Sequence, residues 1–464
     1  MFLTKTGRGE TLWDEHQPLH PLCLLTTTTD YIIPCNNLSH FKRVQERLSG
    51  AVKRSCTSLS FLFSSTRNVT TTIRRIAESP FNPSYSNWSN RHAPNLWCDT
   101  LLLPVMKENE STHDGTQSIL QQFESFLPGL NAQKHLCVHG DQLTNERVRH
   151  VAAIQRSNYD NDGNETPFHT FSWAVPIVGL FHLQWKGMLK SICMVYFCDI
   201  LQPCCVVVGV NAEKVREAIS FRESAKIVKL AKEVLLSMLL EMWIDKNVTS
   251  CRQNNGVTVE RNFCSWLLDS SRDDILETIA HAPTAPEVIR EHCSRLCRVR
   301  NFVKHSMMYD IMDKGILHGD PLSVRDAMMA LFPLMRVARR TKYCLEMKIL
   351  LFKTFHVWSK DFANHVWGNM FLSVRRPLDR SKGSKHIAHD MGNEIYVRAV
   401  KSVLKKIPNV SDQNLTTVNA ILMNCVVQKE ISDVMKVRIP FLPVPIVIAR
   451  LNRSILHFAL LQTP

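Results

Sequence analysis

The chain has 464 residues, of which 45% are hydrophobic and 21% charged, the composition of a globular protein with roughly three domains' worth of chain. Its 56 lysines and arginines exceed its 42 aspartates and glutamates, so the formal net charge is +14. This excess favours an anionic partner, nucleic acid first and an acidic membrane surface second. Residues 1–20 lack the apolar run of a secretion signal, so the 15 cysteines predict reduced thiols in the cytoplasm or nucleus and exclude a secreted disulfide scaffold.

In the first half of the chain, the composition and the hydrophobic periodicity change near residue 96. Residues 1–95 are rich in serine, threonine and asparagine with weak periodicity, which predicts a loosely ordered N-terminal region. Residues 96–190 alternate between short apolar runs and helical spacing, which predicts an α/β core. In chain order we expect a strand within 96–106, a helix over 114–127, a strand over 134–141, a helix over 143–156 capped by Thr144 or Asn145, and a strand over 174–181.

The second half is predicted to be a helical insertion followed by a return to the core. Residues 191–385 carry apolar residues three and four apart over many turns, which predicts mainly helix. Ser191–Val210 has about the length of a membrane span. Polar residues and a proline interrupt it, so we expect no span but a buried helix, a turn and a strand. Residues 386–464 are expected to supply a returning core helix and an apolar tail. The predicted fold is thus an α/β core interrupted by a large all-α insertion, mostly α over the whole chain.

Asp141 is the first candidate for chemistry, because it follows an apolar run and Gly140 and precedes a predicted helix. Carboxylates at strand ends hold Mg²⁺ in phosphoryl-transfer enzymes, since the oxygen ligands must converge from different chain segments. The alternative is a turn aspartate that caps the helix. His182 ends the next predicted strand and would lie near Asp141 if the two strands were parallel; its alternative is a buried histidine bonded to a backbone carbonyl.

A second pair of acids lies near the end of the chain. Asp390 and Glu394 are four residues apart, so on a helix they share one face and could ligate a hard cation. The alternative is a helix N-terminus, with Asp390 as its cap and Glu394 favouring the positive end of the dipole. A zinc-like spacing also occurs, but no second paired motif accompanies it, so we do not expect zinc there. Its residues are His292, Cys293, Cys297 and His305.

Basic residues gather in three clusters, which suit a phosphate backbone or, alternatively, a solvated surface. The clusters are Arg336, Arg339, Arg340 and Lys342; Arg375, Arg376, Arg380, Lys382 and Lys385; and Lys401, Lys405 and Lys406.

Four segments occur in a characteristic order: Gly140–Thr144 (GDQLT), Phe181–Gln184 (FHLQ), Arg340–Glu346 (RTKYCLE) and Asp390–Lys401. In this order they resemble the uncharacterised eukaryotic family catalogued as domain of unknown function 6589, whose genes are mobile-element-like. The resemblance covers residues 96–410. The sequence departs from the family where Ile395 and Val397 replace a histidine and an asparagine.

The resemblance implies a layout similar to a transposase catalytic core, an RNase H-like α/β fold split by a long helical insertion. Asp141 and Glu394 would then be catalytic, acting with Mg²⁺ or Mn²⁺ on a phosphodiester. The metal ligands would be Asp141, His182, Asp390 and Glu394. The phosphates of nucleic acid, expected to be DNA, would be held by Arg147, Arg149, Arg375, Arg376 and Lys401.

The function predicted from the sequence is therefore that of a mobile-element-derived protein that contacts nucleic acid, with metal-dependent nuclease or strand-transfer chemistry as the enzyme hypothesis. Two alternatives stay open. One is a non-catalytic nucleic-acid-binding or assembly module with the same fold. The other is a degraded copy without activity.

Overall fold

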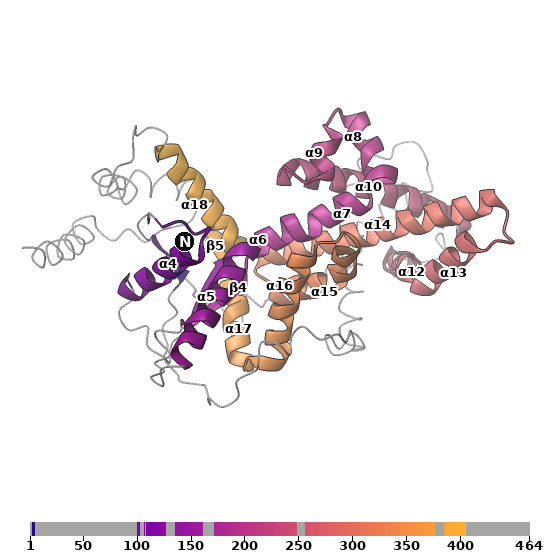
Figure 1. Cartoon of the computed structure of the whole chain (residues 1–464). Coiled ribbons are helices and arrows are strands. Elements are labelled where there is room, and N and C mark those ends of the chain that lie inside the picture. Colours follow the sequence, from indigo (N-terminus) through magenta and orange to yellow (C-terminus); the bar gives the residue numbers. More distant parts are fainter. Residues whose placement is uncertain are drawn as a thin grey trace, which may run out of the picture. The chain divides into compact units, whose positions relative to one another are not determined.

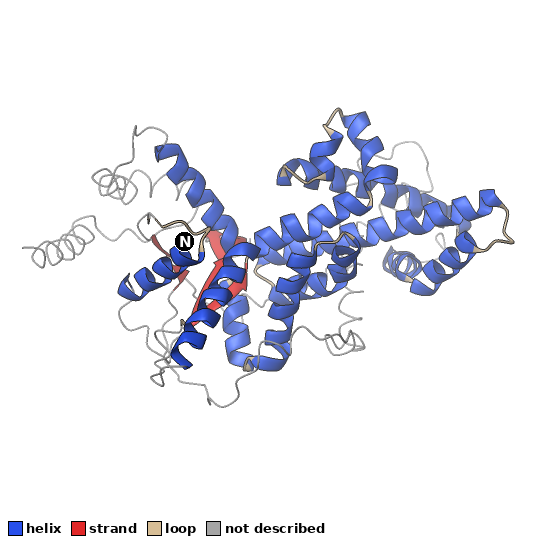
Figure 2. Cartoon of the chain, viewed as in Figure 1, coloured by secondary structure: helices blue, strands red, loops and turns tan. Residues whose placement is uncertain are grey.

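The computed structural model describes residues 2–4, 100–102, 106, 108–126, 135–160, 171–247, 256–375 and 385–404. These residues are mostly helical, with a few short strands (Figure 2). The chain divides into two compact units. Unit 1 comprises Met1–Glu15, Ala93–Ile177 and Asn369–Pro464, and unit 2 comprises His16–His92 and Val178–Gly368. Most of the N-terminal region predicted to be loosely ordered, and the whole apolar C-terminal tail, lie outside the described residues.

Unit 1 contains three two-stranded sheets among its described residues. Its elements are β1 (Phe2–Thr4), β2 (Thr100–Leu102), α4 (His113–Phe126), β3 (Leu136–Gly140), α5 (Gln142–Asp160), β4 (Ala174–Val178), β5 (Phe371–Arg375), β6 (Lys385–Ala388) and α18 (His389–Leu404) (Figure 1). The pairs β1–β2 and β5–β6 are antiparallel, and β3 is hydrogen-bonded to β4. Helix α18 packs against β3, β5 and β6, so the last described helix contacts a strand, β3, that lies about 250 residues earlier in the chain.

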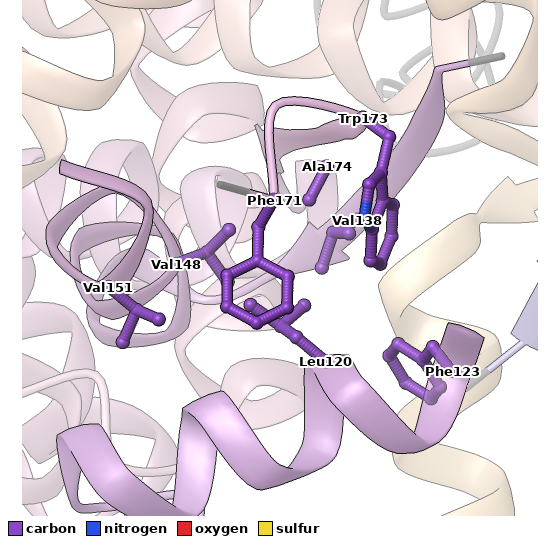
Figure 3. Close-up of a cluster of buried hydrophobic side chains, with 8 residues drawn as sticks. All are labelled: Leu120, Phe123, Val138, Val148, Val151, Phe171, Trp173 and Ala174. Atoms are coloured by element: carbon purple, nitrogen blue, oxygen red, sulfur yellow. The ribbon is translucent and has the colours of Figure 1, made fainter. Parts of the chain in front are cut away.

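A small apolar core holds the first part of unit 1 together (Figure 3). On α4, Leu120 and Phe123 are three residues apart and therefore share one face of the helix; each is only 1% exposed. Removing such side chains from water contributes roughly 1.5–3 kcal/mol each to folding. The cluster consists of Leu120, Phe123, Val138, Val148, Val151, Phe171, Trp173 and Ala174.

Apart from Val178, the last residue of β4, the described residues of unit 2 form helices and the turns that join them. Three of its helical segments are π-helical, a geometry that is rare and is often found at functional sites. In chain order the elements are α6 (Leu180–His182), the π-helix η2 (Leu183–Leu189), α7 (Lys190–Val195), the π-helix η3 (Phe197–Leu201), α8 (Gln202–Val208), α9 (Ala212–Arg216), α10 (Phe221–Lys246), α12 (Gly256–Leu268), α13 (Ser270–His281), α14 (Glu287–His318), α15 (Pro321–Val337), α16 (Thr341–Phe352), the π-helix η4 (Lys353–Val357) and α17 (Lys360–Asn369).

The turn between α14 and α15 shows why the local sequence folds as it does. Gly319 adopts a left-handed conformation with φ 61° and ends α14, a conformation that costs glycine little because it has no Cβ. Asp320 then caps α15, because its side chain accepts the backbone N–H groups of Leu322 and Ser323. The segment HGDPLS therefore ends one helix and begins the next.

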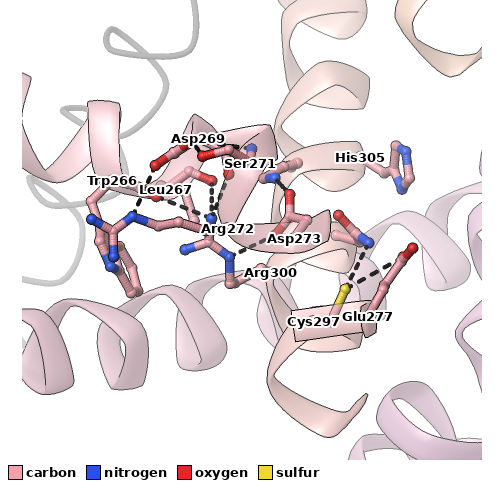
Figure 4. A network of polar contacts seen from close by, with 12 residues as sticks. Trp266, Leu267, Asp269, Ser271, Arg272, Asp273, Glu277, Cys297, Arg300 and His305 are labelled. Atoms are coloured by element: carbon pink, nitrogen blue, oxygen red, sulfur yellow. Dashed lines mark hydrogen bonds and ion pairs between the residues drawn. The ribbon is translucent and has the colours of Figure 1, made fainter. Parts of the chain in front are cut away.

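A buried arginine ties α12 and α13 to α14 (Figure 4). Arg300 has no exposed surface; its Nε donates to Asp273 Oδ1 at 2.9 Å. Its Nη2 donates to the carbonyls of Trp266, Leu267 and Asp269, which lie at and just beyond the end of α12. The last carbonyls of a helix lack partners inside the helix, so this guanidinium satisfies groups that would otherwise be buried unbonded.

Two predicted elements are wrong in detail. The strand predicted over 174–181 ends at Val178, and Leu180–His182 is already helical. The apolar run continues past Val178 because the following helix is buried on most sides. A fully buried helix and a buried strand have the same apolar pattern, so the sequence did not separate them. The run Ser191–Val210 is also helical rather than helix, turn and strand, with a break at Tyr196.

No single helix in the described parts of the chain is long and apolar enough to cross a membrane. The segments Leu180–Val195 and Phe197–Val208 meet the length and composition criteria together, but they are bent by 71° relative to each other.

Candidate functional site

Asp141 caps helix α5. Its Oδ1 accepts the backbone N–H of Thr144 at 2.8 Å, and its carbonyl accepts the N–H of Asn145 at 3.1 Å. The cap predicted at Thr144 or Asn145 is therefore wrong by one turn, since α5 begins at Gln142. The helix cap, which is the alternative to a metal ligand at Asp141, is therefore present. It uses one of the two carboxylate oxygens of Asp141.

The strand that leads to Asp141 packs against the helix that carries the other two candidate acids. Strand β3 ends at Gly140, and α18 lies against it. Asp390 is in the first turn of α18 and only 3% exposed, and Glu394 is partly buried one turn later. Unit 1 thus brings together the chain segments of Asp141, Asp390 and Glu394, although about 250 residues separate the first from the last.

Two histidines that the sequence did not single out meet beside these acids. His139 on β3 and His389 at the start of α18 have ring centroids 4.7 Å apart. Burial lowers the pKa of His139 well below its usual range; His389 lowers it further and Asp390 acts in the opposite direction. Burial lowers the pKa of His389 to about 4. Both rings are therefore neutral near pH 7. The available signal was that each acid closely follows a histidine, in HGD and in HD.

These side chains do not form a complete three-ligand set in the described residues. Among them, no three histidine, cysteine, aspartate or glutamate side chains form a group that could hold a metal ion. His182, predicted at a strand end, is instead on helix α6 in unit 2. The centroid of its ring lies 5.5 Å from the ring centroid of Phe181. Mg²⁺ commonly takes only one or two protein carboxylates, its other ligands being water and substrate phosphates. The metal prediction for Asp141, His182, Asp390 and Glu394 therefore stays a prediction.

The predicted phosphate-binding residues fall into different surroundings. Arg147 donates to the carbonyl of Glu110 at 2.8 Å and so helps to hold unit 1 together. Arg149 is partly buried on the same helix. Arg375 ends β5, with its backbone opposite Lys385, and Lys401 is in α18. The side chains of Arg375 and Lys401 are outside the described residues, and so is the whole of Arg376.

Three of the four residues with zinc-like spacing are buried or hydrogen-bonded in unit 2, and the fourth, His292, is exposed. Cys297 Sγ lies 3.6 Å from Glu277 Oε1 and accepts a hydrogen bond from Asn301 at 3.5 Å. His305 Nδ1 is 2.7 Å from the hydroxyl of Tyr196. Cys293 is buried on the same helix, α14.

A cluster of cations forms where α15, α16 and the π-helix η2 pack together in unit 2. Arg340 links the start of α16 to η2, because its Nε donates to the carbonyl of Lys186 at 3.0 Å. The two residues are 154 positions apart in the sequence. Arg336 and Lys342 are exposed on either side of this contact, and Arg339 is exposed with φ 54°, in the left-handed region. We call this surface the basic corner; it consists of Lys186, Lys190, Arg336, Arg339, Arg340 and Lys342.

The positive charges of the basic corner act on one another. Burial lowers the pKa of Lys186, and repulsion from Lys190 and Arg340 lowers it further. One carboxylate offsets part of this charge: Glu217 lies 2.9 Å from Lys190, whose hydrogen bond lowers the pKa of Glu217. Six cations thus surround this one carboxylate, so the basic corner keeps an excess of positive charge.

Aromatic rings alternate with the cations of the basic corner. Lys186 Nζ lies 3.5 Å from the ring centroid of Trp185. The guanidinium of Arg340 lies 5.8 Å from the ring centroid of Tyr343. The indole of Trp185 is held in place, since its Nε1 donates to the carbonyl of Ala218 at 2.7 Å. Cations fixed over aromatic faces lose less side-chain entropy on binding an anion than freely rotating ones.

Comparison with known proteins identifies the family and no closer relation. No curated protein and no solved structure matches the chain. A model of a family of unknown function, DUF6589, matches residues 86–437, which include β3, the basic corner and α18. The resemblance recognised from the GDQLT, FHLQ, RTKYCLE and Asp390–Lys401 segments is confirmed, and the chain belongs to this family of unknown function.

Proposed function

We propose that the protein binds nucleic acid through the basic corner. The observation that carries this proposal is the crowding of cations at Lys186, where Arg340 Nε lies 3.0 Å from the Lys186 carbonyl and where Lys190 and Arg340 both repel the Lys186 ammonium. Such repulsion is unfavourable in the free protein, and an anion placed there would relieve it. The net charge of +14 agrees with a polyanionic partner.

The layout favours a nucleic acid over a small anion. The cations come from η2, α7, the end of α15 and the start of α16, so several separate segments present them. A chain of phosphates can contact several such cations at once, and each contact releases condensed counterions. The rings of Trp185 and Tyr343 offer flat surfaces beside the cations, which suits bases. The family resemblance adds mobile-element origin to the proposal and makes DNA the first partner to test.

The test is binding of fluorescently labelled DNA and RNA to the full chain, followed by polarisation. The triple variant Arg336→Gln/Arg339→Gln/Lys342→Gln removes three exposed charges from the basic corner. We expect its affinity near 0.1 M salt to fall by about tenfold or more, because three phosphate contacts are lost. The matched control, Arg261→Gln/Arg295→Gln/Lys360→Gln, removes three exposed charges from α12, α14 and α17.

The control should retain most of the affinity. Equal losses in the two triple variants would mean that binding follows net charge alone and would contradict a defined interface. No binding by the parent would overturn the proposal.

A second candidate function is the metal-dependent nuclease, with unit 1 as an RNase H-like core and unit 2 as its insertion. What supports it is chain order and packing: unit 1 is built from segments on both sides of unit 2, and α18 packs on β3. Asp141, Asp390 and Glu394 would then hold Mg²⁺ or Mn²⁺, with water and phosphate completing the coordination. The bound ion would supply charge stabilisation for phosphodiester cleavage.

Calorimetry of Mg²⁺ and Mn²⁺ binding to the full chain tests this candidate. We expect binding by the parent and its loss in Asp141→Asn and in Glu394→Gln. Asparagine is as good an N-cap as aspartate, so Asp141→Asn keeps the cap of α5 while removing the charge. Metal binding that survives in both variants would exclude these acids as ligands, and its absence from the parent would leave nucleic-acid binding as the function.

A further inference from the structure

The helical hairpin formed by α15, α16 and η4 presents only positive charge to solvent. Helices α15 and α16 pack against each other, and η4 follows α16 directly (Figure 1). Residues 321–358 contain two acids, Asp326 and Glu346, and both are buried. The seven cations of the same segment are all at least partly exposed: Arg325, Arg336, Arg339, Arg340, Lys342, Lys348 and Lys353. The hairpin therefore extends the positive charge of the basic corner, which lies at its turn.

The aromatic residues of this hairpin are kept at its surface. The buried positions of α15 and α16 are filled by aliphatic side chains such as Leu331, Leu350 and Leu351. Aromatic side chains would contribute more free energy by burial, because each has a large apolar area. All five aromatic residues of the segment are nevertheless at least partly exposed: Phe332, Tyr343, Phe352, Phe355 and Trp358. A run of exposed rings of this kind indicates a binding surface.

Cations lie near four of these five rings. The donors alternate between the two helices, because Lys348 of α16 lies near a ring of α15, and Arg325 of α15 lies near a ring of η4. Arg325 and Phe332 are seven residues apart, which is about 10 Å along α15. From the turn of the hairpin outward, the distances to the ring centroids are 5.8 Å for Arg340 and Tyr343, 5.8 Å for Lys348 and Phe332, 5.2 Å for Arg325 and Phe355, and 5.9 Å for Lys353 and Trp358.

We propose that this hairpin binds single-stranded nucleic acid, an inference that rests on the nucleic-acid binding proposed for the basic corner. The cations would contact phosphates, and unpaired bases would stack on the rings. Cations interleaved with exposed aromatic rings are the usual means of holding a single strand, and stacking tolerates any sequence because every base has a flat face. A duplex offers its phosphates to the same cations, but its bases are paired and stacked on one another. The rings therefore select for strandedness and not for sequence.

The length of the surface favours a polymer over a mononucleotide. Helix α15 has 17 residues and is therefore about 25 Å long. Pairs of cation and ring occur at its two ends and between them. A single nucleotide could contact one such pair, whereas a strand can contact them in succession.

Fluorescence polarisation of the full chain with labelled oligothymidine and with labelled duplex DNA of equal length, about 15 nucleotides, tests the proposal. Phe332→Leu/Phe355→Leu removes two rings and keeps the charge and the apolar character of both positions. We expect its affinity for oligothymidine to fall at least about tenfold, because two stacking contacts are lost. Its affinity for the duplex should change less than about twofold, since the duplex contacts the cations alone. Retained duplex binding also shows that the variant is folded.

Leu345→Ala is the matched control. Leu345 is 48% exposed on α16, so the substitution removes exposed apolar surface from the same hairpin without removing a ring, and both probes should bind as they do to the parent. Undiminished oligothymidine binding by the double variant, an equal loss for both probes, or the same loss in Leu345→Ala would overturn the single-strand inference and leave the basic corner as a binding site. A parent that binds neither probe would overturn the proposed function as well.

Discussion

At the scale of single residues, Asp141 has a structural role as a helix cap that is compatible with the predicted metal site. Its Oδ1 accepts the N–H of Thr144, which satisfies one of the first four N–H groups of α5 that have no partner within the helix. A carboxylate has about four lone-pair positions, so capping leaves acceptor capacity. The cap is therefore a structural role that exists whether or not a metal ion binds.

Replacement of Asp141 separates its structural role from its charge. Asp141→Ala should lower the free energy of unfolding by about 1 kcal/mol, because the cap is lost. Asp141→Asn should change it by only a few tenths, since asparagine caps equally well. Urea unfolding of the two variants and the parent measures the difference. Equal destabilisation by Ala and Asn would mean that the charge, rather than the cap, stabilises the fold.

His305 gives unit 2 a sensitivity to acid. Burial, and to a lesser extent Lys304, lowers the pKa of His305 to about 4, while its Nδ1 bonds the hydroxyl of Tyr196 at 2.7 Å. The unfolded chain takes up this proton below its ordinary pKa near 6.5, whereas the folded chain does not until about pH 4. The unfolded state thus binds more protons in this window, and stability falls as the pH falls.

The expected loss between pH 6.5 and pH 4 is at most roughly 3 kcal/mol from this one group. His305→Gln should remove this part of the pH dependence, because glutamine does not titrate and can still bond Tyr196. Thermal unfolding of both proteins across this range measures the difference. Two parallel pH profiles would show that His305 is protonated equally easily in the folded and unfolded chains.

At the scale of elements, α14 and α15 pack closely because a glycine lies between them. A Cβ built at Gly315 would lie 3.0 Å from Ser323 Cβ and from Val324 Cγ2, and 3.1 Å from the backbone nitrogen of Val324. The backbone atom cannot rotate away. The glycine therefore sets the separation of the two helices, at the cost of weaker helix propensity.

Gly315→Ala should destabilise the protein by about 1 kcal/mol. Overpacking costs about 1–3 kcal/mol, which outweighs the gain of about 1 kcal/mol in helix propensity. Ser294→Ala, at an exposed position of the same helix, should instead stabilise slightly. Thermal unfolding of the two variants gives the comparison. A higher melting temperature for Gly315→Ala would show that the helices can move apart without loss.

At the scale of the whole molecule, the charge excess of +14 is a property of the sequence, but its organisation is not. Some cations are committed to structure: Arg300 is buried against Asp273, and Arg147 bonds a backbone carbonyl. The basic corner concentrates six others on one surface. Affinity for nucleic acid should therefore depend on this surface and not on the total charge.

The salt dependence of DNA binding measures how many phosphates the molecule contacts. For duplex DNA the logarithm of affinity falls by about 0.9 per contact for each unit in the logarithm of salt concentration. Six cations in the basic corner thus set a slope no steeper than about 5 if they make all the contacts. A much steeper slope would locate further contacts elsewhere, and a slope near zero would mean that binding is not electrostatic.

Much of the helical structure and the family membership could be inferred from local patterns. Apolar spacing predicted α4, α5 and α10, because helix periodicity depends on neighbours three and four residues away. The same patterns failed at Leu180–Val208, where a helix is buried on most sides and its apolar run resembles a strand. The Gly-Asp motif correctly suggested a cap, since capping is a local interaction.

The chemistry of the candidate sites depends instead on contacts between distant segments. His139 and His389 are 250 positions apart in the printed sequence, and Lys186 meets Arg340 across 154. The lowered pKa values of His139, His389 and Lys186 arise from burial and from neighbours that only folding brings close. A pattern within one helix or strand carries no information about such neighbours, because loop closure and packing select them. Periodicity, capping and the cluster from Arg336 to Lys342 thus follow from the chain itself. The histidine pair, and the addition of Lys186 and Lys190 to that cluster, exist only after the chain has packed.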